Sequence, residues 1–180
     1  LATQRVAEWA IAQGIPHLVF ASSGSVYGVK EEEKVTEDLS LVPISAYNKT
    51  KMVAERVLMS YQDHFRLHIF RPATICGVSP RMRFDLTVNL LTLQALSAGR
   101  ITVFGGDQVR PNIHVDDIAR VYLHFLDQPS IESGVYNAGF ENLAVQEIAE
   151  MITARVPAEI IVSASNDPRS YRVDSAKLAA

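Results

Sequence analysis

The sequence has only one cysteine, Cys76, in 180 residues. A single thiol excludes an internal disulfide, so covalent cross-links cannot hold this fold together. Cys76 follows an apolar stretch and no histidine is patterned near it, which favours a small buried apolar residue over a nucleophile. No apolar run reaches the length of a membrane-spanning helix, and no signal peptide is visible. We therefore predict a cytoplasmic protein without a membrane partner.

Charge of either sign is also modest. Charged residues make up 21% of the chain and the formal net charge is −3, which gives no electrostatic case for binding nucleic acid. A few local arginines would still suffice to bind a phosphate group. Hydrophobic residues reach 48%, so a chain of this length can bury a sizeable core.

Metal-binding patterns are missing as well. His64 and His68 have the spacing of two ligands on one helix, but the segment between them passes from a helix end into a strand, where that spacing loses its geometry. No HExxH motif and no cluster of cysteine, histidine and carboxylate residues completes a site. We expect no metal ion in this protein.

What the sequence does have is a tyrosine with a lysine four residues later, Tyr47 and Lys51. On a helix these side chains share one face, so both could reach the same ligand. A free phenol titrates near pH 10, and a neighbouring ammonium favours the phenolate, which can take a proton from an alcohol. The pair alone arises often by chance, and an exposed helical turn is then its simplest interpretation.

The context of the pair makes it more specific. Residues 15–21 are an apolar run of strand length, and Ser22-Ser23-Gly24 follows where a parallel strand would release its side chains into a ligand crevice. A serine hydroxyl can both donate to and accept from a reacting oxygen. Hydroxyls at a strand end, with this pair at the start of the next helix, suit reversible conversion between an alcohol and a ketone.

Strand and helix patterns alternate along the chain, which is typical of an α/β fold. Gly99 should end an apolar helix, and Asp116 or Asp117 should cap a helix that runs to about Leu126. The other helices are expected over residues 1–13, 48–63, 86–98 and 144–155, and strands over 15–21, 66–71, 101–104 and 113–115.

A series of short segments follows one another along nearly the whole chain. They are SSGSVYG (22–28), the Thr36-Glu37-Asp38 loop, SAYNKTK (45–51) with Glu55 beyond it, FRPATICG (70–77), ITVFGG (101–106), VRPNIHVDD (109–117) and VYNAG (135–139). In this order they resemble the extended short-chain dehydrogenase/reductase family, in particular its NAD-dependent nucleotide-sugar epimerases and dehydratases of the UDP-glucose 4-epimerase type. The ordered series is far more specific than any one segment.

This resemblance implies roles for several residues. Tyr47 corresponds to the catalytic base, Lys51 to the residue that binds the nicotinamide ribose and favours the phenolate, and Ser23 to the catalytic serine or threonine. Without the resemblance, Ser23 would be interpreted as a strand-end hydroxyl bonded to local backbone. Gly24 and Ser25 stand where the family's dehydratases carry an Asp-Glu pair, so 4,6-dehydration is disfavoured.

The resemblance also implies a ligand-binding set. Ala73 lies where the family backbone passes the nicotinamide, although an ordinary strand-to-loop turn would explain the segment equally simply. Planar guanidinium groups suit the substrate diphosphate. Arg110 has an exposed arginine as its alternative interpretation, and Arg172 competes with Arg169 for its role. The residues assigned to the substrate are Thr74, Asn89, Arg110 and Arg169.

By the same resemblance, residues 1–85 are the C-terminal half of a dinucleotide-binding domain, that is, the second half of a doubly wound parallel, Rossmann-like sheet. Residues 86–180 are a smaller α/β substrate-binding portion, from which 111–127 return to the nucleotide-binding domain. The chain begins at Leu1 inside a helical pattern, and its 9 glycines form no GxGxxG or GxxGxxG motif, with which a dinucleotide fold opens. We therefore expect a fragment at both ends, with roughly 100 residues missing upstream.

Three functions are consistent with these observations. The first is an epimerase that uses NAD, or NADP, to oxidise a nucleotide-activated sugar transiently to a keto-sugar. The second is an NADPH-dependent reductase of 4-keto-sugar nucleotides, because both reactions use the same residues. The third is a non-catalytic dinucleotide-binding protein, which the intact set of Ser23, Tyr47 and Lys51 disfavours. The isolated fragment should be inactive.

The family's mode of association implies a homodimer through the helices of residues 1–13 and 48–63, which have broad apolar faces. Burial against the protein's own core would give the same pattern, and the sequence does not decide between the two explanations.

Overall fold

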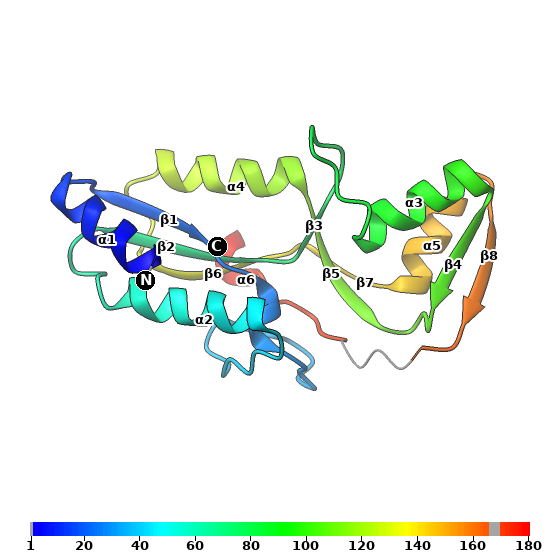
Figure 1. Ribbon diagram of the computed structural model, residues 1–180, viewed down its shortest axis with the longest axis horizontal. Coiled ribbons are helices and arrows are strands. Elements are labelled where there is room, and N and C mark those ends of the chain that lie inside the picture. The colour runs from blue at the N-terminus through cyan, green and yellow to red at the C-terminus, as the bar shows by residue number, and fades with distance from the viewer. Residues whose placement is uncertain (1, 166–169) are drawn as a thin grey trace.

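A computed structural model describes residues 2–165 and 170–180 of the chain. The molecule is elongated, with a lobe at each end and long strands between them (Figure 1). The helices are α1 (Ala2–Ala12), the 3₁₀-helix η1 (Gly24–Tyr27), α2 (Ala46–Met59), α3 (Thr87–Ala98), α4 (Val115–Asp127), α5 (Val145–Thr153) and α6 (Ala176–Ala179). The strands are β1 (His17–Ala21), β2 (Arg66–Pro72), β3 (Thr74–Cys76), β4 (Arg100–Phe104), β5 (Val109–His114), β6 (Gly134–Ala138), β7 (Glu141–Ala144) and β8 (Glu159–Ser163).

The first lobe is built on the parallel strands β1, β2 and β6, in that spatial order. Leu18 of β1 lies beside Leu67 of β2, and Ile69 of β2 lies beside Val135 of β6. Parallel neighbours need a crossover connection, which α2 supplies between β1 and β2. Because β6 follows α3, β4, β5 and α4 in the chain, the C-terminal half contributes both this strand and the covering helix α4.

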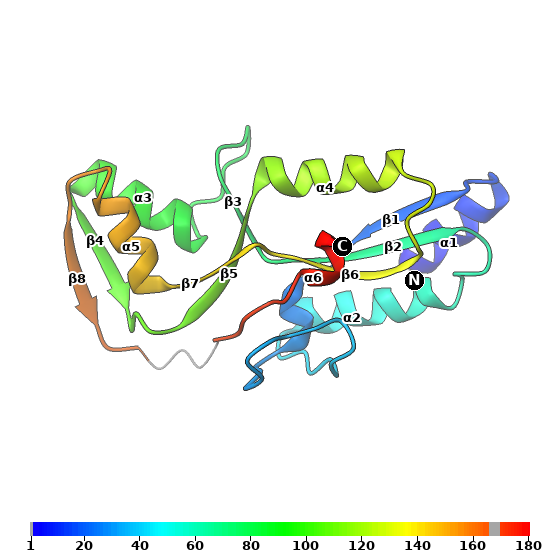
Figure 2. The ribbon, with the colours of Figure 1, turned by 180° about the vertical axis from the view of Figure 1, so that it is seen from behind.

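Helices cover both faces of the sheet (Figures 1 and 2). On one face, Ile118 and Phe125 of α4 are buried with Phe70 of β2 and Tyr136 of β6. The rings of Phe70 and Phe125 meet edge to face, with centroids 4.7 Å apart, an arrangement that aromatic pairs favour. The segment after β5 therefore packs on the sheet of the first lobe.

The helices on the other face divide their apolar residues between core and surface. Ala7 of α1 and Leu58 of α2 are buried together against β2. Val6 and Trp9 of α1 and Val53 of α2 remain more than half exposed, at 55%, 61% and 52%. The fold thus uses only part of the apolar faces that the sequence indicates.

The ends of two helices differ from the sequence prediction. α2 spans Ala46–Met59 rather than 48–63, because residues 60–64 form turns. α4 is capped by His114, whose Nδ1 accepts a hydrogen bond from the backbone N–H of Asp116 at 3.3 Å. The prediction of Asp116 or Asp117 as the cap was therefore wrong. Both lie in the first turn, where carboxylates interact favourably with the helix dipole.

The second lobe packs α3 and α5 against the parallel pair of β4 and β8. Leu91 of α3, Ile101 of β4 and Ile148 of α5 are buried in its core. α3 ends at Gly99 as predicted, and the φ of Gly99, 61°, is a left-handed conformation that favours glycine. The sequence did not indicate β8, most of whose residues are exposed.

The strands between the lobes form a further sheet in the order β3, β5, β7. β3 pairs with β5 in parallel and β7 pairs with β5 antiparallel. Within the described residues, no helix has both the length and the apolarity needed to cross a membrane.

Candidate active site

A cleft of about 1190 Å³ lies beside the carboxyl ends of β1 and β2. This edge of a parallel sheet is where ligands bind in open α/β folds, and the volume exceeds the roughly 300–1,000 Å³ typical of ligand pockets. The walls come from η1, the first turns of α2, β3 with the loop after it, α3 and β5. The sequence-predicted residues that line the cleft are Ser23, Tyr47, Lys51, Ala73, Thr74, Asn89 and Arg110.

Tyr47 and Lys51 lie one turn apart at the start of α2. The helix begins there because the Ser45 hydroxyl caps it, accepting a hydrogen bond of 3.1 Å from the backbone N–H of Asn48. Tyr47 is 56% exposed, and Lys51 Nζ lies 5.8 Å from the centre of its ring. Lys51 Nζ also donates to the carbonyl oxygen of Ala21 at 2.7 Å, which fixes the ammonium at the end of β1. An ammonium has three donors, so this bond leaves two for a ligand.

Ser23 follows β1 and begins a short chain of polar groups. Its Oγ caps η1 by accepting from the backbone N–H of Ser25 at 3.2 Å. The hydroxyl oxygens of Ser23 and Ser25 are 2.7 Å apart, and the Ser25 hydroxyl donates to Oδ1 of Asn48 at 2.8 Å. The local backbone bond expected from the simpler interpretation exists, and the hydroxyl still lines the cleft. These groups connect the strand end to α2 beside Tyr47.

Ala73 and Thr74 lie at the junction of β2 and β3. The backbone N–H of Ala73 donates to Ala138 at 2.8 Å, so this turn is tied to the end of β6. A Cβ on Gly139 would lie 2.7 Å from the Ala73 Cβ, so glycine is needed there for this close approach. Thr74 starts β3 beside Asn112 of β5 and is half-buried in the cleft wall.

Asn89 of α3 is buried and holds the loop between β3 and α3. Its Oδ1 accepts from the backbone N–H of Gly77 at 3.0 Å, and its Nδ2 donates to the carbonyl of Arg83 at 2.9 Å. One amide N–H of Asn89 is left over for another acceptor. The side chain therefore positions the arginines that this loop carries.

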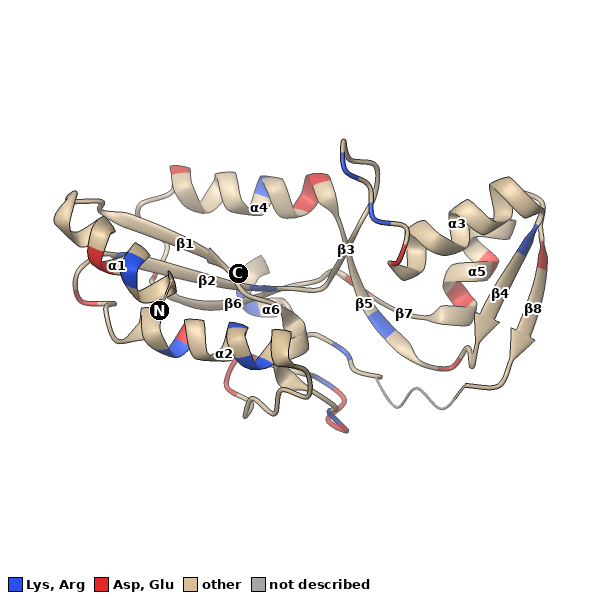
Figure 3. Ribbon diagram, in the orientation of Figure 1, with Lys and Arg blue, Asp and Glu red and all other residues tan. Residues whose placement is uncertain are grey.

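Basic residues gather on this side of the cleft. Figure 3 shows them on the loop between β3 and α3 and on β5, and Arg81, Arg83 and Arg110 line the cleft. Arg83 donates two hydrogen bonds to Asp85, at 3.1 and 2.8 Å. Both side chains are largely exposed, so this pair adds little to folding stability. Arg169 lies outside the described residues.

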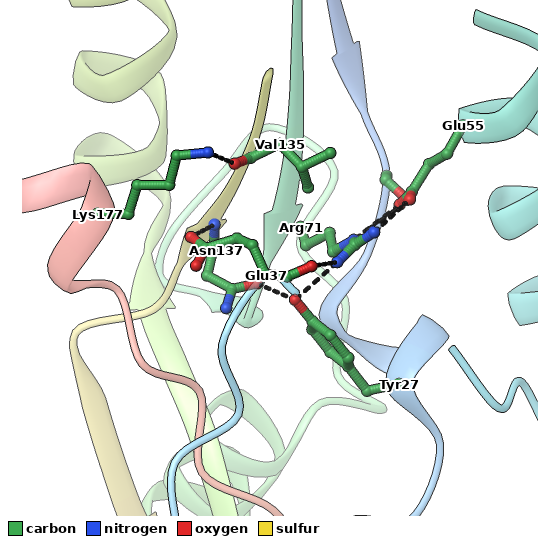
Figure 4. Close-up of polar contacts among 8 residues, drawn as sticks. Tyr27, Glu37, Glu55, Arg71, Val135, Asn137 and Lys177 are labelled. Atoms are coloured by element: carbon green, nitrogen blue, oxygen red, sulfur yellow. Dashed lines mark hydrogen bonds and ion pairs between the residues drawn. The ribbon is translucent and has the colours of Figure 1, made fainter. Parts of the chain in front are cut away.

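A buried ion pair lies behind the cleft wall (Figure 4). Arg71 of β2 and Glu55 of α2 are 4% and 1% exposed, and Arg71 Nη2 lies 2.7 Å from Glu55 Oε2. Arg71 Nε adds a bond of 3.1 Å to Glu55 Oε1. The hydroxyl of Ser22 donates to the same Oε1. Through Ser22, the residue before Ser23, the pair thus links the end of β1 to α2 and β2.

The network continues away from the cleft through Tyr27. Arg71 Nη1 donates to the Tyr27 hydroxyl at 2.8 Å and to the carbonyl of Glu37 at 3.1 Å, and the Tyr27 hydroxyl donates to Asn137 Oδ1 at 2.8 Å (Figure 4). Burial raises the pKa of Tyr27, although the charge of Arg71 opposes this effect. Burial by itself lowers the pKa of Arg71, but the hydrogen bonds to Glu55 and the charges around it raise the pKa overall. Arg71 therefore stays charged and Tyr27 stays protonated.

Cys76 is the last residue of β3. It is half-buried, and its thiol donates to the carbonyl of Ile113 at 3.6 Å. Burial raises the pKa of this thiol, so it is a poor nucleophile. In the described part of the chain, no group of three histidine, cysteine or acidic side chains is placed to hold a metal ion.

Comparison with known sequences identifies the family. The sequence profile of the NAD dependent epimerase/dehydratase family matches residues 1–139. The chain belongs to this family. An uncharacterised UDP-glucose epimerase of Bacillus subtilis (strain 168) is 34% identical over 155 residues, which are 84% of this chain and 48% of the relative. The UDP-glucose 4-epimerase of Lactobacillus helveticus is 27% identical over 187 residues, covering 91% of this chain and 57% of that protein. The chain thus spans about half the length of these relatives.

Solved structures match this epimerase/dehydratase fold throughout the chain. UDP-glucuronic acid 4-epimerase from Bacillus cereus, in complex with UDP-glucuronic acid and NAD, has a TM-score of 0.84 and 28% identity, covering 98% of this chain and 58% of that one. MoeE5, in complex with UDP-glucuronic acid and NAD, has a TM-score of 0.85 and 27% identity, covering 98% of this chain and 62% of that one. The family and the α/β class inferred from the sequence are confirmed.

Sequence reasoning missed the partners of the predicted residues in this family member. Ser25 and Asn48 give no signal alone, because each is an ordinary polar residue in a turn or a helix start. The ion pair of Glu55 and Arg71 did leave a signal. Arg71 ends an apolar strand and Glu55 lies on the helix face that carries Leu58, and charges at buried positions need a partner.

Proposed function

We propose that this chain is the catalytic and substrate-binding part of an epimerase that acts on a nucleotide-activated sugar through transient oxidation to a keto-sugar, with NAD, or NADP, as cofactor. One observation carries the proposal: Ser23, Tyr47 and Lys51 line the same cleft as Arg81 and Arg110. The cleft therefore offers groups for redox chemistry at a hydroxyl and cations for a diphosphate. Two similar solved structures hold UDP-glucuronic acid and NAD, which supports this class of ligand.

In the proposed reaction, Tyr47 takes the proton from a sugar hydroxyl as the carbon that bears it loses a hydride. NAD supplies the hydride acceptor when bound. Lys51 Nζ lies 5.8 Å from the centre of the Tyr47 ring, beside the group that would take the proton. Ser23 holds the reacting oxygen by hydrogen bonding. Rotation of the keto-sugar and return of the hydride to its other face, with the proton from Tyr47, gives the epimer.

Ser23, Tyr47, Lys51 and Ala73 would hold the nicotinamide end of the cofactor. The ammonium of Lys51 donates one hydrogen bond to the Ala21 carbonyl, and its two other N–H groups suit two ribose hydroxyls. The chain has no glycine-rich turn for the pyrophosphate, so we propose that the whole protein contains one in a further segment. The 180-residue chain alone should then bind NAD weakly and turn over no sugar. A micromolar NAD affinity of this chain in calorimetry would contradict that expectation.

The substrate would lie across the cleft from Thr74 to the arginines. We propose that Thr74 contacts sugar hydroxyls and that Arg110 and Arg169 bind the diphosphate, for which bidentate guanidinium contacts are suited. Asn89 has one amide N–H left for the diphosphate, and it also holds the loop of Arg83 in place. Substitution of Arg110 by methionine should raise KM more than it lowers kcat.

A reductase of 4-keto-sugar nucleotides remains the alternative enzyme, since it would use the same three groups. An epimerase retains its NAD through each turnover, whereas a reductase consumes NADPH. Dehydration is disfavoured because Gly24 has no side chain and Ser25 carries only a hydroxyl, so neither position supplies a carboxyl group.

The test is turnover of a panel of UDP-activated and dTDP-activated sugars by the whole protein and its Tyr47→Phe variant. We expect conversion without added NADPH, and a loss of at least about 100-fold in kcat in the variant. Tyr61→Phe is the matched control, because the Tyr61 hydroxyl donates to exposed Glu8 at 3.3 Å and Tyr61 does not line the cleft. NAD binding without any conversion would favour the non-catalytic alternative, and consumption of NADPH would favour the reductase.

We also propose that a second copy of the chain covers the exposed apolar residues Val6, Trp9 and Val53. They lie on α1 and α2, which pack against each other. Trp9→Glu should shift the sedimentation coefficient of the whole protein from dimer to monomer. Val78→Glu is the control, because Val78 is 82% exposed in the loop after β3. A monomeric wild-type protein would rule the dimer out.

A further inference from the structure

We propose that Ser25 and Asn48 are positioning residues that set the direction of the Ser23 hydroxyl proton. In one direction Ser23 accepts a hydrogen bond from a sugar hydroxyl, and in the other it donates one to a sugar carbonyl. The inference rests on the proposed redox chemistry at Tyr47, but it concerns residues to which the family resemblance assigns no role.

The hydrogen bonds around Ser23 determine where its proton points. Ser25 has one hydroxyl hydrogen, and it is donated to Asn48 Oδ1 at 2.8 Å. The 2.7 Å contact between the two hydroxyl oxygens must therefore use the hydrogen of Ser23. Ser23 Oγ also accepts from the backbone N–H of Ser25 at 3.2 Å. A hydroxyl oxygen has two acceptor positions, so Ser23 presents one remaining lone pair and no hydrogen to the cleft.

This arrangement suits oxidation of the sugar hydroxyl but not reduction of the ketone. A sugar hydroxyl donates well to the free lone pair of Ser23 while Tyr47 prepares to take its proton. Once the sugar is a ketone, its oxygen carries no hydrogen and needs a donor. An acceptor facing an acceptor is repulsive, so Ser23 must reverse to stabilise the carbonyl and the charge that develops on it.

Asn48 can reverse the chain without any covalent change. Rotation of its amide places Nδ2 where Oδ1 was, and Nδ2 then donates to Ser25 Oγ. Ser25 donates in turn to Ser23 Oγ, and the Ser23 hydrogen becomes free for the ketone oxygen. The Ser23 oxygen then accepts from the backbone N–H and the hydroxyl of Ser25, and its own hydrogen is donated to the ketone. All of its hydrogen-bonding positions are then used. In the described part of the chain, the Asn48 side chain has no other hydrogen bond to lose on rotation.

Asn48→Asp tests the direction of the chain in the whole protein. A carboxylate has the shape of the amide but only accepts, so it locks Ser23 as an acceptor. We expect kcat to fall about tenfold or more, the equivalent of one lost transition-state hydrogen bond, with KM within about threefold of wild type. Ser25→Ala, which removes the link without adding charge, should lower kcat similarly, and Ser25→Thr should restore it.

Ligand binding gives a second readout that a packing defect would not reproduce. The probe is a nucleotide sugar whose reacting hydroxyl is replaced by fluorine, which cannot donate, compared by calorimetry with the natural sugar in the presence of NAD. Asn48→Asp should weaken binding of the fluorinated sugar about tenfold relative to the natural one, because locked Ser23 offers it no hydrogen. Wild type should show a smaller preference.

Ser60→Ala is the control, since the Ser60 hydroxyl donates only to Val57 at the far end of α2. It should leave kcat unchanged. If wild type turns over sugars and Tyr47→Phe does not, but Ser25→Ala and Asn48→Asp keep kcat within about twofold of wild type, the inference is wrong while the proposed function stands. A loss that Ser25→Thr does not restore, with an unchanged ligand preference, would also overturn it. Failure of wild type on every sugar nucleotide would instead reject the proposed function.

Discussion

Ser22 and Ser23 are neighbours in the chain, but they belong to networks of opposite character. The hydroxyl of Ser22 bonds to Glu55, whose ion pair with Arg71 is sealed from solvent. Ser23 faces the cleft, where Tyr47 is 56% exposed. In the buried network, donors and acceptors bond to one another and hold α2, β1 and β2 together. The cleft groups keep some donors and acceptors available for a ligand. We expect substitutions in the first to reduce folding stability and substitutions in the second to change chemistry alone.

Arg71→Met should have the largest effect on stability. It leaves the Glu55 carboxylate buried without its cation, which costs about 3–5 kcal/mol in the free energy of unfolding. Urea denaturation followed by circular dichroism measures this loss. Arg83→Met, which breaks the exposed pair with Asp85, is the control and should cost less than about 1 kcal/mol. Equal losses in the free energy of unfolding of the two variants would show that burial does not determine how much each ion pair stabilises the fold.

Tyr27→Phe should have an intermediate effect. Removing the hydroxyl leaves Asn137 Oδ1 buried without the hydrogen that Tyr27 donates at 2.8 Å. The expected cost is about 1–3 kcal/mol, because Arg71 Nη1 keeps its bond to the Glu37 carbonyl. Tyr61→Phe serves as the control in the same denaturation assay. A loss in the free energy of unfolding no greater than that of Tyr61→Phe would mean that the buried network does not depend on the Tyr27 hydroxyl.

A pair of histidines, of which His68 is buried and His17 half-buried, extends the comparison to neutral groups. His17 Nε2 and His68 Nδ1 are 2.7 Å apart, and His68 Nε2 donates to the Glu132 carbonyl at 3.0 Å, so His68 Nδ1 must accept from His17. Burial, followed by the charge of Arg66, lowers the pKa of His17, and burial lowers the pKa of His68. The folded protein thus keeps both rings neutral at a pH where the unfolded chain, with a pKa near 6.5, already binds protons.

Stability should therefore fall as the pH drops below about 6.5, by at most ~1.4 kcal/mol per pH unit for each ring. Above pH 7 these rings should contribute no pH dependence. Denaturation curves between pH 5 and pH 8 measure the slope. His17→Gln, which removes one ring of the pair, should reduce this slope. A flat profile down to pH 5 would contradict the assigned neutral pair.

The smallest effect is expected in the cleft. Tyr47→Phe and Lys51→Met should each change the free energy of unfolding by no more than about 0.5 kcal/mol, because Tyr47 is largely exposed and the Lys51 bond to Ala21 can be replaced by water. The same denaturation assay tests this. A loss above about 1 kcal/mol would show that the cleft groups also hold the fold together.

The parts of this molecule that were readable from its sequence are those with a local pattern. The end of α3 at Gly99 follows from the left-handed conformation that glycine tolerates. Tyr47 and Lys51 share a helix face by spacing alone, and Ser23 was found near them because it ends a recognisable strand. Their presence in one cleft was thus predictable, whereas their roles stay predictions.

What was not readable depends on contacts between distant segments. The His114 cap was missed because aspartate is the commoner capping residue and two of them follow. Asn48 bonds Ser25 across 23 positions of sequence, and Tyr27 bonds Asn137 across 110. No local pattern encodes such partners. β8 was missed because its exposed residues lack the alternation of a half-buried strand.

The position of β2 between β1 and β6 also bears on how the protein folds. Ile69 pairs with Phe20 of β1, but its other neighbour, Val135, follows only after α3, β4, β5 and α4. Tyr27 must wait still longer for Asn137. Because pairing of distant segments must overcome loop-closure entropy, we expect β2 to pair with β6 more slowly than with β1. During synthesis, the edge of β2 that pairs with β6 therefore stays unpaired until β6 has been made.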